Sequence, residues 1–498
     1  MNASERDQTI LALNDRLSDW TRAHARWGAH RDRRTLDRER RLACLPLADA
    51  LRYAARVETA ARVHLPPTPA CQAAVAIVRR LRDAGHAAFL VGGCVRDLLL
   101  QLAPKDFDVA TSAHPPEVRA LFRHVVEVGV AFGVLRVHQR DAADTLHEIE
   151  VATFRAEAGY SDGRRPDEVR FTDAREDVLR RDFTINGLLC DPLDVLDGEA
   201  AVVDWVGGLD DLAHRRLRAI GAPRERFTED ALRLLRAPRF AARFHLALEP
   251  QTERAIQDLA PTLARVSAER VRDELQAMLR VPTAPRALAL IAQLGLGEVL
   301  WPELAALRTG QMDAVARIAA VHREIDRLRD TDWPGGHAVD QAVDLPLALA
   351  AVLYPVRDAW PAKRLADRLK LARHEVRRVG LICQIADALP EPLPDFDAIQ
   401  RTPAWIRALR LADADAALIV RESLAQDGRA GQLRGDRARV PRTLWSPALF
   451  VTGDTLHALG RRPGPQFRAA LAAAEDTQLL GGSAQQALAA ALATFPAR

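Results

Sequence analysis

The stretch PKDFDVATS, residues 104–112, alternates charged and apolar side chains and then continues into small polar residues. Such alternation is typical of a β-strand, on which residues i and i+2 point to the same face. Asp106 and Asp108 would therefore lie side by side, with Cα atoms roughly 6–7 Å apart at a rise of about 3.3 Å per residue. Carboxylate oxygens are ligands that Mg²⁺ prefers, so the pair predicts a metal site. A strand edge carrying two solvated acids is the alternative.

A glycine pair precedes this strand in VGGCVRD, residues 91–97. Gly92 and Gly93 can adopt backbone angles that other residues avoid, and they let a phosphate approach the main chain closely. We expect a helix to begin here, and a helix N-terminus attracts anions. Arg96 could add a charge-assisted contact. A plain strand-to-helix turn is the alternative, but the spaced acids that follow favour a nucleotide site.

A third acid is offered by HEIEVATF, residues 147–154. Glu148 and Glu150 alternate with apolar residues and would share one strand face. If this strand pairs beside the strand of the two aspartates, Glu150 could complete a carboxylate triad. Glu148 is better suited to a solvated outer face.

Length and composition describe a globular protein of several domains. A chain of 498 residues, 48% hydrophobic and 28% charged, predicts two to four domains. The net charge of +3 says little about partners, so any basic surface must be local. The five cysteines are scattered without a C-x-x-C pair, which favours a reducing compartment over a disulfide framework or a zinc site. We find no signal-peptide core and no apolar run of about 18 residues, and we expect a cytoplasmic protein without a membrane partner.

The pattern along the chain predicts an α+β fold. Residues 1–69 read as a charged helical extension that ends at a proline cluster. Residues 70–207 combine Val- and Ile-rich strands with helices, as a small mixed-sheet head. From 208 onward the apolar residues recur with helical period, and we expect a neck over 208–285 and an all-helical body and tail over 286–498.

Ordered motifs carry a resemblance to a known family. The blocks are FLVGGCVRDLLL, KDFDVATSA, GVAFGVLRV, IEVATFR, RRPDEVRF, RRDFTINGL, VDWVGGLDDL and RFTEDALRLLRAPRFAARF. Their order resembles that of the bacterial class II tRNA nucleotidyltransferases, which have a DNA-polymerase-beta-like head, and the bacterial poly(A) polymerases share the same blocks. The resemblance is dense over residues 88–280 and reappears over 450–475.

The resemblance implies roles for the acids and for a second block. Asp106 and Asp108 match the family's metal ligands, with Mg²⁺ as the cofactor, and Glu150 matches its third acid. In RRDFTIN, Arg181, Asp182 and Asn186 match residues that contact the sugar and phosphates of the nucleotide.

The block EDALR is implied to select the base. Glu229, Asp230 and Arg233 match the segment whose acid and arginine bind the incoming base. Asp230 and Arg233 would be neighbours at i and i+3 on a helix. A carboxylate accepts from the exocyclic amine of cytosine or adenine and a guanidinium donates to ring acceptors, whereas guanine and uracil present the opposite pattern.

Pro238 departs from the family pattern, because it interrupts a segment that otherwise continues as a helix. A proline removes a backbone donor and clashes with the preceding turn. We therefore expect a kink, and we do not expect Arg236 and Arg239 to bind the nucleotide.

Four functions remain open. The favoured one is addition of C, C and A to the 3′ end of tRNA from CTP and ATP. The alternatives are a poly(A) polymerase and an A-adding tRNA nucleotidyltransferase, and, from another class, a non-catalytic RNA-binding protein on the same fold. AFGVLRV resembles the tRNA nucleotidyltransferase version of its block. The loop RAEAGYSDGRRPDEVRF, with Arg164, Arg165 and Asp167, keeps nearly full length, which disfavours a CC-only enzyme.

A tRNA substrate requires a basic surface that follows phosphates. The interval 421–442 is rich in arginine with few acids, and its Gly and Pro residues predict a loop. The candidate RNA contacts are Arg421, Arg429, Arg434, Arg437, Arg439 and Arg442, with Arg461 and Arg462 beyond. A solvated surface loop is the alternative. The sequence does not decide the oligomeric state.

Overall fold

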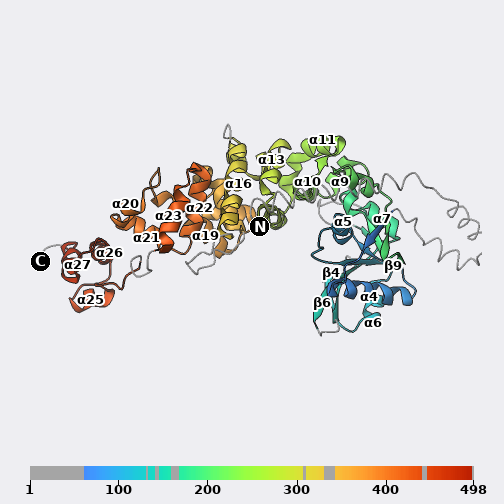
Figure 1. Ribbon diagram of the computed structural model, residues 1–498, viewed down its shortest axis with the longest axis horizontal. Helices are drawn as coiled ribbons and strands as arrows, with labels where there is room; N and C mark the ends of the chain where they lie inside the picture. The colour runs from blue at the N-terminus through green and yellow to red at the C-terminus, as the bar shows by residue number, and fades with distance from the viewer. Residues whose placement is uncertain are drawn as a thin grey trace, which may run out of the picture. The chain divides into compact units, whose positions relative to one another are not determined.

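The computed structural model describes residues 61–129, 133–140, 145–158, 168–306, 310–329, 343–439 and 446–495 (Figure 1). The chain divides into two compact units, of which one ends at Val266 and the other begins at Ser267. We call them the head unit and the helical unit. The predicted extension lies outside the described residues except for positions 61–69.

The head unit is built on a mixed sheet. Its strands are β1 (Ala61–His64), β2 (Ala88–Val91), β3 (Asp108–Thr111), β4 (Val125–Gly129), β5 (Val134–Arg140), β6 (Leu146–Thr153), β7 (Arg155–Ala158), β8 (Glu168–Phe171), β9 (Leu189–Leu196), β10 (Glu199–Val203), β11 (Arg216–Leu217) and β12 (Ala247–Leu248). Eight of them form one sheet in the order β1-β10-β9-β2-β3-β6-β5-β4. Within it, β3 and β6 run parallel, with Val109 opposite Val151, and the other neighbouring strands are antiparallel.

Strand β1 corrects the prediction that residues 1–69 are helical. Ala61 and Val63 are buried and alternate with the more exposed Arg62 and His64, which is the period of a strand. The strand pairs antiparallel with β10 at the edge of the sheet. Its four residues are too few for the sequence alone to distinguish this period from that of a helix.

The head unit also contains helices. They are α4 (Pro69–Asp83), α5 (Gly93–Leu99), α6 (Pro115–Leu121), α7 (Ala174–Leu179), α8 (Gly208–Ala213), α9 (Pro223–Glu229), α10 (Leu232–Arg243) and α11 (Pro250–Leu259), with 3₁₀ turns η2 (Thr184–Asn186) and η3 (Ala260–Arg265). Of these helices, α4 and α5 pack against the eight-stranded sheet. Helix α4 lies against strands β2, β3, β6 and β9 (Figure 1). It begins after Thr68, whose side chain accepts the N–H of Cys71. The chain leaves the helix through Gly85, which has φ +92°.

The core of the head unit explains why these strands form. Phe89, Val91, Ala110, Phe154 and Leu189 belong to one buried cluster between the sheet and its helices. A fully buried side chain of this size contributes about 1.5–3 kcal/mol. Strands β2 and β3 are buried on both faces apart from the half-buried Asp108, whereas β6 alternates, so the apolar positions of β6 fix which of its faces turns inward.

The helical unit contains helices throughout its described length. They are α12 (Ala268–Leu279), α13 (Ala284–Gln293), α14 (Gly297–Leu300), α15 (Pro302–Ala305), α16 (Gly310–Arg329), α17 (Leu345–Leu353), η4 (Tyr354–Ala359), α18 (Ala362–Leu369), α19 (Arg373–Ala388), α20 (Phe396–Gln400), α21 (Pro403–Leu409), α22 (Ala414–Ala425), α23 (Arg429–Arg439), α25 (Gly453–Ala458), α26 (Pro465–Leu479) and α27 (Ala484–Ala493). These helices, and the mixed sheet of the head unit, confirm the predicted α+β class.

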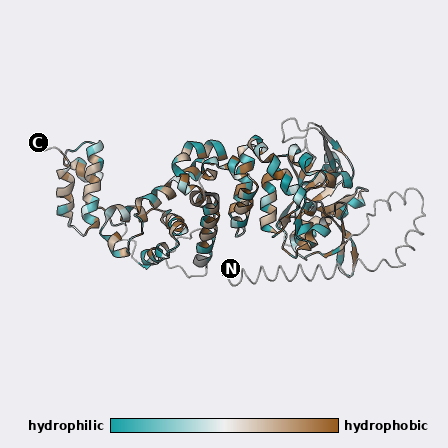
Figure 2. Cartoon of the chain, turned by 90° about the horizontal axis from the view of Figure 1, so that it is seen from above, coloured by the Kyte–Doolittle hydropathy of each residue, from teal (hydrophilic) through white to brown (hydrophobic). Residues whose placement is uncertain are grey.

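Helix α17 is the centre of the helical unit. All of its residues are buried, and it packs against α12, α16, α19 and α22. A helix that is apolar all round must be covered on every side, whereas polar and apolar residues alternate along the other helices of this unit (Figure 2). Within the described ranges, no helix has both the length and the apolar character that a bilayer crossing requires.

Candidate active site

A pocket of the head unit gathers most of the residues predicted from the sequence. Its volume is about 440 Å³. It is lined by Gly92, Gly93, Arg96, Asp108, Arg180, Arg181, Asp182, Asn186, Asp230, Arg233, Arg236, Arg239, Phe240 and Arg243. Seven arginines face three aspartates in this lining, so the pocket carries a strong positive charge. Such a surface suits a polyanionic ligand.

The glycine bend forms one wall of the pocket. Gly92 has φ +71° and ψ −123°, a conformation that a residue with a Cβ rarely adopts. Its N–H donates to the carbonyl of Leu188 at 3.1 Å. A Cβ at this position would lie 3.0 Å from Nη1 of Arg181, so a side chain here would push that guanidinium away. The prediction that a helix follows the glycines is confirmed by α5, which begins at Gly93.

The two aspartates differ in position. Asp108 is the first residue of β3 and stands opposite Val91 of β2, whereas Asp106 lies before the strand with an exposed side chain. The prediction that both acids lie on the strand is therefore wrong for Asp106, because β3 starts two residues later. Phe107 is buried between them and anchors this approach to the strand.

The third acid lies beside Asp108. Because Val109 is opposite Val151 in the parallel β3–β6 pair, the preceding residues Asp108 and Glu150 continue the same register. Strand β6 thus pairs beside the strand of Asp108, as the predicted triad requires. The carboxylate of Glu150 also contacts Arg136 on β5, at 3.3 Å from Nη2.

Negative charge accumulates around the start of β3, next to Glu150 of β6. Burial raises the pKa of Asp108 to about 6, the neighbouring Glu150 and Asp106 act in the same direction, and Arg181 opposes them. Among the residues that the structure describes, no group of three or more His, Cys, Asp or Glu has the geometry to hold a metal ion. Asp106, Asp108 and Glu150 nevertheless supply carboxylate oxygens, the donors that a hard divalent cation takes, so their chemistry is compatible with such a cation.

The RRDFTIN block supplies a network of fixed charges. Burial favours the neutral form of Asp182, but Arg236 and a hydrogen bond from Asn186 outweigh it and lower the pKa of Asp182 to about 2. Arg181 is held by Asp177 at 3.0 Å, and the side-chain oxygen of Asn186 accepts from Arg96 at 2.6 Å. These contacts orient the block toward the pocket.

The segment EDALR is not one helix. Helix α9 ends at Glu229, Asp230 has an extended backbone, and α10 begins at Leu232. The predicted i, i+3 helical pair is therefore wrong, because the carboxylate of Asp230 accepts the N–H of Leu232 and interrupts the helix. Arg233 donates to the carboxylate of Glu229 at 2.8 Å, and it also donates to backbone carbonyls. Asp230 and Arg233 still line the same pocket.

Pro238 does not break α10. The helix runs from Leu232 to Arg243 with the proline inside it. Arg236 and Arg239 both line the pocket, contrary to the expectation that the kink would displace them. Arg236 donates to Asp182 at 2.9 Å, and the guanidinium of Arg239 lies 4.2 Å from the centre of the Phe240 ring.

The comparisons with known proteins agree with this arrangement. A family model described as "Poly A polymerase head domain" matches residues 88–218, and one described as "Probable RNA and SrmB-binding site of polymerase A" matches residues 244–307. A CCA-adding enzyme of Geobacillus stearothermophilus is 36% identical over 315 residues, which cover 60% of this chain and 74% of that protein. The chain belongs to the class II tRNA nucleotidyltransferase family.

Other relatives support the membership. A CCA-adding enzyme of Lactobacillus gasseri is 42% identical over 227 residues, and the match spans 45% of this chain and about half, 54%, of that relative's length. The crystal structure of the Bacillus stearothermophilus CCA-adding enzyme in complex with CTP is 29% identical, with a TM-score of 0.64, and the match covers 83% of this chain and 94% of that one. The Thermotoga maritima CCA-adding enzyme complexed with tRNA has a TM-score of 0.57 at 19% identity, which supports the fold alone.

Within this family member, sequence reasoning missed several pocket residues. They are Arg180, Arg236, Arg239, Phe240 and Arg243. The signal was present, because positions 236, 239 and 243 repeat at i, i+3 and i+7 and so share one face of a helix. This pattern was set aside because a kink was expected at Pro238. The predicted residues Asp106 and Glu150 are not part of the pocket lining and lie at the sheet edge near Asp108.

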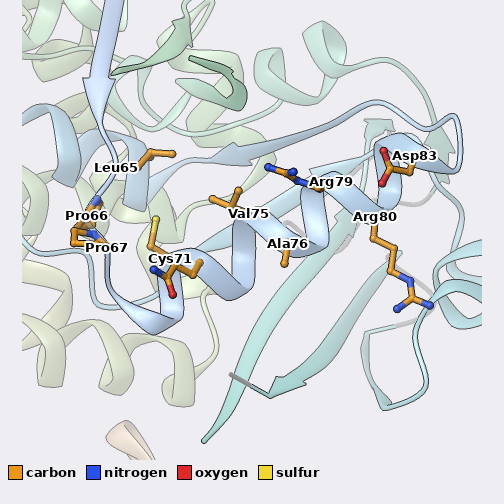
Figure 3. A pocket seen from close by; sticks show the side chains of 10 residues that line it. Leu65, Pro66, Pro67, Cys71, Val75, Ala76, Arg79, Arg80 and Asp83 are labelled. Carbon is orange, nitrogen blue, oxygen red and sulfur yellow. The ribbon is translucent and has the colours of Figure 1, made fainter. Parts of the chain in front are cut away.

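A second pocket of the nucleotidyltransferase head has a different character. It lies along α4, with Pro66, Pro67 and Cys71 at one end and Arg80 and Asp83 at the other (Figure 3). None of the predicted site residues lines it. Burial raises the pKa of the Cys71 thiol to about 11, so this cysteine is not poised as a nucleophile. The predicted site residues gather in the arginine-lined pocket instead.

Of the eight predicted RNA arginines of the helical unit, three turn inward, whereas Arg429 stays exposed beside Asp427. The interval predicted to be a loop forms α23 over Arg429–Arg439. Arg421 is buried and donates to three backbone carbonyls, and Arg434 is buried against Glu324. Arg437 contacts Asp415 at 2.9 Å. The expectation that this interval forms an RNA-binding loop is therefore wrong for these three arginines, because internal acceptors lie within their reach.

The remaining predicted contacts stay predictions. Arg439 is exposed, and so is Arg462, whereas Arg461 is half-buried. Arg442 and the loop residues Arg164, Arg165 and Asp167 lie outside the described residues.

Proposed function

We propose that this chain transfers CMP and AMP from CTP and ATP to the 3′ end of tRNA and so builds or repairs the CCA terminus. The observation that carries the proposal is the single pocket in which a glycine bend, Asp108, a cluster of arginines and the Asp230–Arg233 pair meet. Phosphate recognition, a metal-binding acid and a base-reading pair are the three components that nucleotidyl transfer without a template requires.

The phosphate end of the nucleotide is assigned to the glycine bend and the arginines. Gly92 and Gly93 leave room beside the backbone, and Arg181 reaches the bend from the RRDFTIN block. Arg239 and Arg243 add positive charge along α10. Arg96 and Asn186 are bonded to each other, so we assign them to holding this wall in place. Fixed cations of this kind stabilise charge without reorganising during the reaction.

The base end is assigned to Asp230 and Arg233. Arg233 is fixed by Glu229 and by the carbonyls of Arg226 and Arg180, so its guanidinium is held before any ligand arrives. A carboxylate accepts from the exocyclic amine of cytosine or adenine, and the guanidinium beside it donates to their ring nitrogens or to the carbonyl of cytosine. Uracil and guanine present the reverse pattern and would leave buried polar groups unpaired.

The acids at the sheet edge are assigned to Mg²⁺. Asp106 and Asp108 would hold it, and Glu150 would complete the donor set. When bound, Mg²⁺ neutralises charge on the attacking and leaving oxygens of phosphoryl transfer. Asp108, a half-buried acid of the pocket lining, would hold this cation next to the reacting phosphate and the tRNA 3′ hydroxyl. Catalysis then comes mainly from positioning and electrostatics.

The domain roles follow from these assignments. We propose that the head over residues 70–207 binds phosphates and metal, that the neck over 208–285 supplies base selection, and that residues 286–498 serve RNA binding. Cys71, Cys94 and Cys190 are buried free thiols, which supports a reducing, cytoplasmic setting.

A poly(A) polymerase is the second candidate, because both matching family models are described by polymerase names. An A-adding tRNA nucleotidyltransferase is a further variant of the first. One experiment separates them: the purified chain is incubated with tRNA ending before CCA, with tRNA ending after CC, and with an unrelated RNA, and each nucleotide is supplied separately. With CTP alone we expect two nucleotides added to tRNA ending before CCA, and with ATP alone we expect one added to tRNA ending after CC. Long ATP-dependent tails on every RNA would establish the polymerase instead, and addition of a single A only after CC would establish the A-adding variant.

A further inference from the structure

The helical unit carries a second group of cations that do not turn inward. Helix α18, the turn after it and the start of α19 form one continuous segment over residues 362–377. Its exposed basic residues are Lys363, Arg368, Lys370, Arg373, His374 and Arg377. We call this set the α18–α19 surface.

The anchored cations of the same segment show how the surface is held. Arg364 pairs with Glu303 and donates to the carbonyl of Ala359 at 2.8 Å. Arg378 donates to Asp413 at 2.8 Å and also pairs with Asp344. These two side chains are directed toward internal acceptors, so the segment is fixed to the rest of the unit by its own arginines.

The turn between the helices is equally well defined. Lys370 has φ +48°, a left-handed conformation that ends α18. Its carbonyl accepts from Nη1 of Arg272 on α12 at 2.9 Å. Leu369 and Leu371, on either side, are buried. The cationic side chains therefore project from a backbone that is already ordered, which lowers the entropic cost of binding.

The exposed lysines and arginines of this surface form no ion pairs with the described residues. They are Lys363, Arg368, Lys370, Arg373 and Arg377. Of the two acids in the segment, Glu375 accepts the N–H of Ala372 as a helix cap, and Asp367 alone stands exposed among the cations. The segment therefore presents uncompensated positive charge to solvent.

The surface lacks the features of a protein interface. Among the described residues between Met312 and Leu411, which include the whole segment, no large hydrophobic side chain is exposed. Protein interfaces rely on buried aromatic and aliphatic anchors. Cations without apolar anchors match the phosphate backbone of a nucleic acid, which is bound by charge and shape more than by sequence.

We propose that the α18–α19 surface binds the phosphate backbone of the RNA substrate. The inference rests on the proposed function only for the identity of that RNA, a structured RNA such as tRNA. Arg373 and Arg377 lie one helical turn apart on α19 and present their charges along one line. The surface takes the role that the sequence assigned to residues 421–442.

The test compares two matched double variants of the full chain. Arg373→Gln/Arg377→Gln removes two cations from the surface, and Arg323→Gln/Arg401→Gln removes two exposed cations elsewhere in the same unit. Binding of tRNA lacking CCA is measured by fluorescence anisotropy over a range of salt concentrations. For the surface variant we expect affinity at about 0.1 M salt to fall at least about 5-fold, and the slope of log K against log salt to shrink by about 1.5–2. For the control variant we expect neither change beyond about twofold.

Two further readouts separate this proposal from the proposed function. CTP binding and the thermal midpoint should be unchanged in the surface variant, and the KM for tRNA should rise while kcat at saturating tRNA stays the same. If both variants lose affinity equally, or the surface variant keeps the wild-type salt slope, the surface is not an RNA site. Capture of a protein partner through this surface with RNA binding intact would also overturn the proposal. If the unaltered chain binds tRNA through the surface but transfers no nucleotide, the proposed function fails and this inference stands.

Discussion

Two segments of this chain are equally rich in arginine and use it differently. On α10 of the head unit, Arg236, Arg239 and Arg243 line a pocket. On α22 and α23 of the helical unit, Arg421, Arg434 and Arg437 are bonded to carbonyls and carboxylates of neighbouring helices. Arginine density therefore does not identify a ligand site. The difference is whether the guanidinium faces a pocket or is enclosed between neighbouring helices.

The largest expected effect is at the acid end of the head pocket. Asp108→Asn keeps the shape of the side chain but removes its charge. We expect nucleotide incorporation to fall at least about 10³-fold, because several kcal/mol of charge stabilisation at the reacting phosphate would be lost. Single-turnover incorporation of CMP into tRNA measures the loss, and an unchanged circular dichroism spectrum shows that the variant is folded. Activity within tenfold of the unaltered chain would remove Asp108 from the mechanism.

The buried arginine of the helical unit should act on stability instead. Arg434→Met leaves Glu324 without its buried partner. Breaking a buried pair in this way costs about 3–5 kcal/mol, which lowers the calorimetric midpoint of a unit of this size by roughly 6–20 °C. The double variant Arg434→Met/Glu324→Leu should recover most of the loss, because no charge remains buried. If Arg434→Met left stability intact but weakened RNA binding, the contrast between the two segments would be wrong.

Base selection should respond to a change of one atom at the α9–α10 junction. Asp230→Asn keeps the oxygen that accepts the N–H of Leu232, so the junction is preserved. The new amide donates where cytosine and adenine also donate, so discrimination against UTP and GTP should fall about 10- to 100-fold, with a smaller change in rate. Competition between CTP and UTP in one reaction measures it. Equal slowing with every nucleotide would show that Asp230 does not read the base.

The comparison also shows what the sequence could and could not reveal. Periodicity located β6 and the helices after residue 208, because burial along one strand or helix face repeats locally. Periodicity did not reveal two boundaries. A single side-chain hydrogen bond sets the extended backbone at Asp230, and the buried Phe107 sets the start of β3 after Asp106. The inward turn of Arg434 escaped periodicity for another reason: Glu324 is 110 positions away in sequence.

A moderate effect is expected at Arg239, which was not expected to bind the nucleotide because of the nearby Pro238. Arg239→Gln removes a pocket cation that stacks on Phe240. We expect the KM for CTP and for ATP to rise together by about 10-fold, because triphosphate binding does not depend on the base. Arg224→Gln on α9 is the control, since that side chain is exposed and pairs with Asp258 at a distance from the pocket lining. A change for one nucleotide alone would place Arg239 at the base end instead.

The smallest effect is expected at Arg439, an exposed arginine of α23. Arg439 on α23 is 79% exposed, and Asp436 lies 3.4 Å away. An exposed pair of this kind contributes less than about 1 kcal/mol, so Arg439→Gln should shift neither the calorimetric midpoint nor the affinity for tRNA measurably. The same anisotropy assay checks this beside Arg377→Gln, which we expect to weaken binding by itself. If Arg439→Gln had the larger effect, residues 421–442 would hold RNA after all, and the inward contacts of Arg421, Arg434 and Arg437 would serve to support that surface.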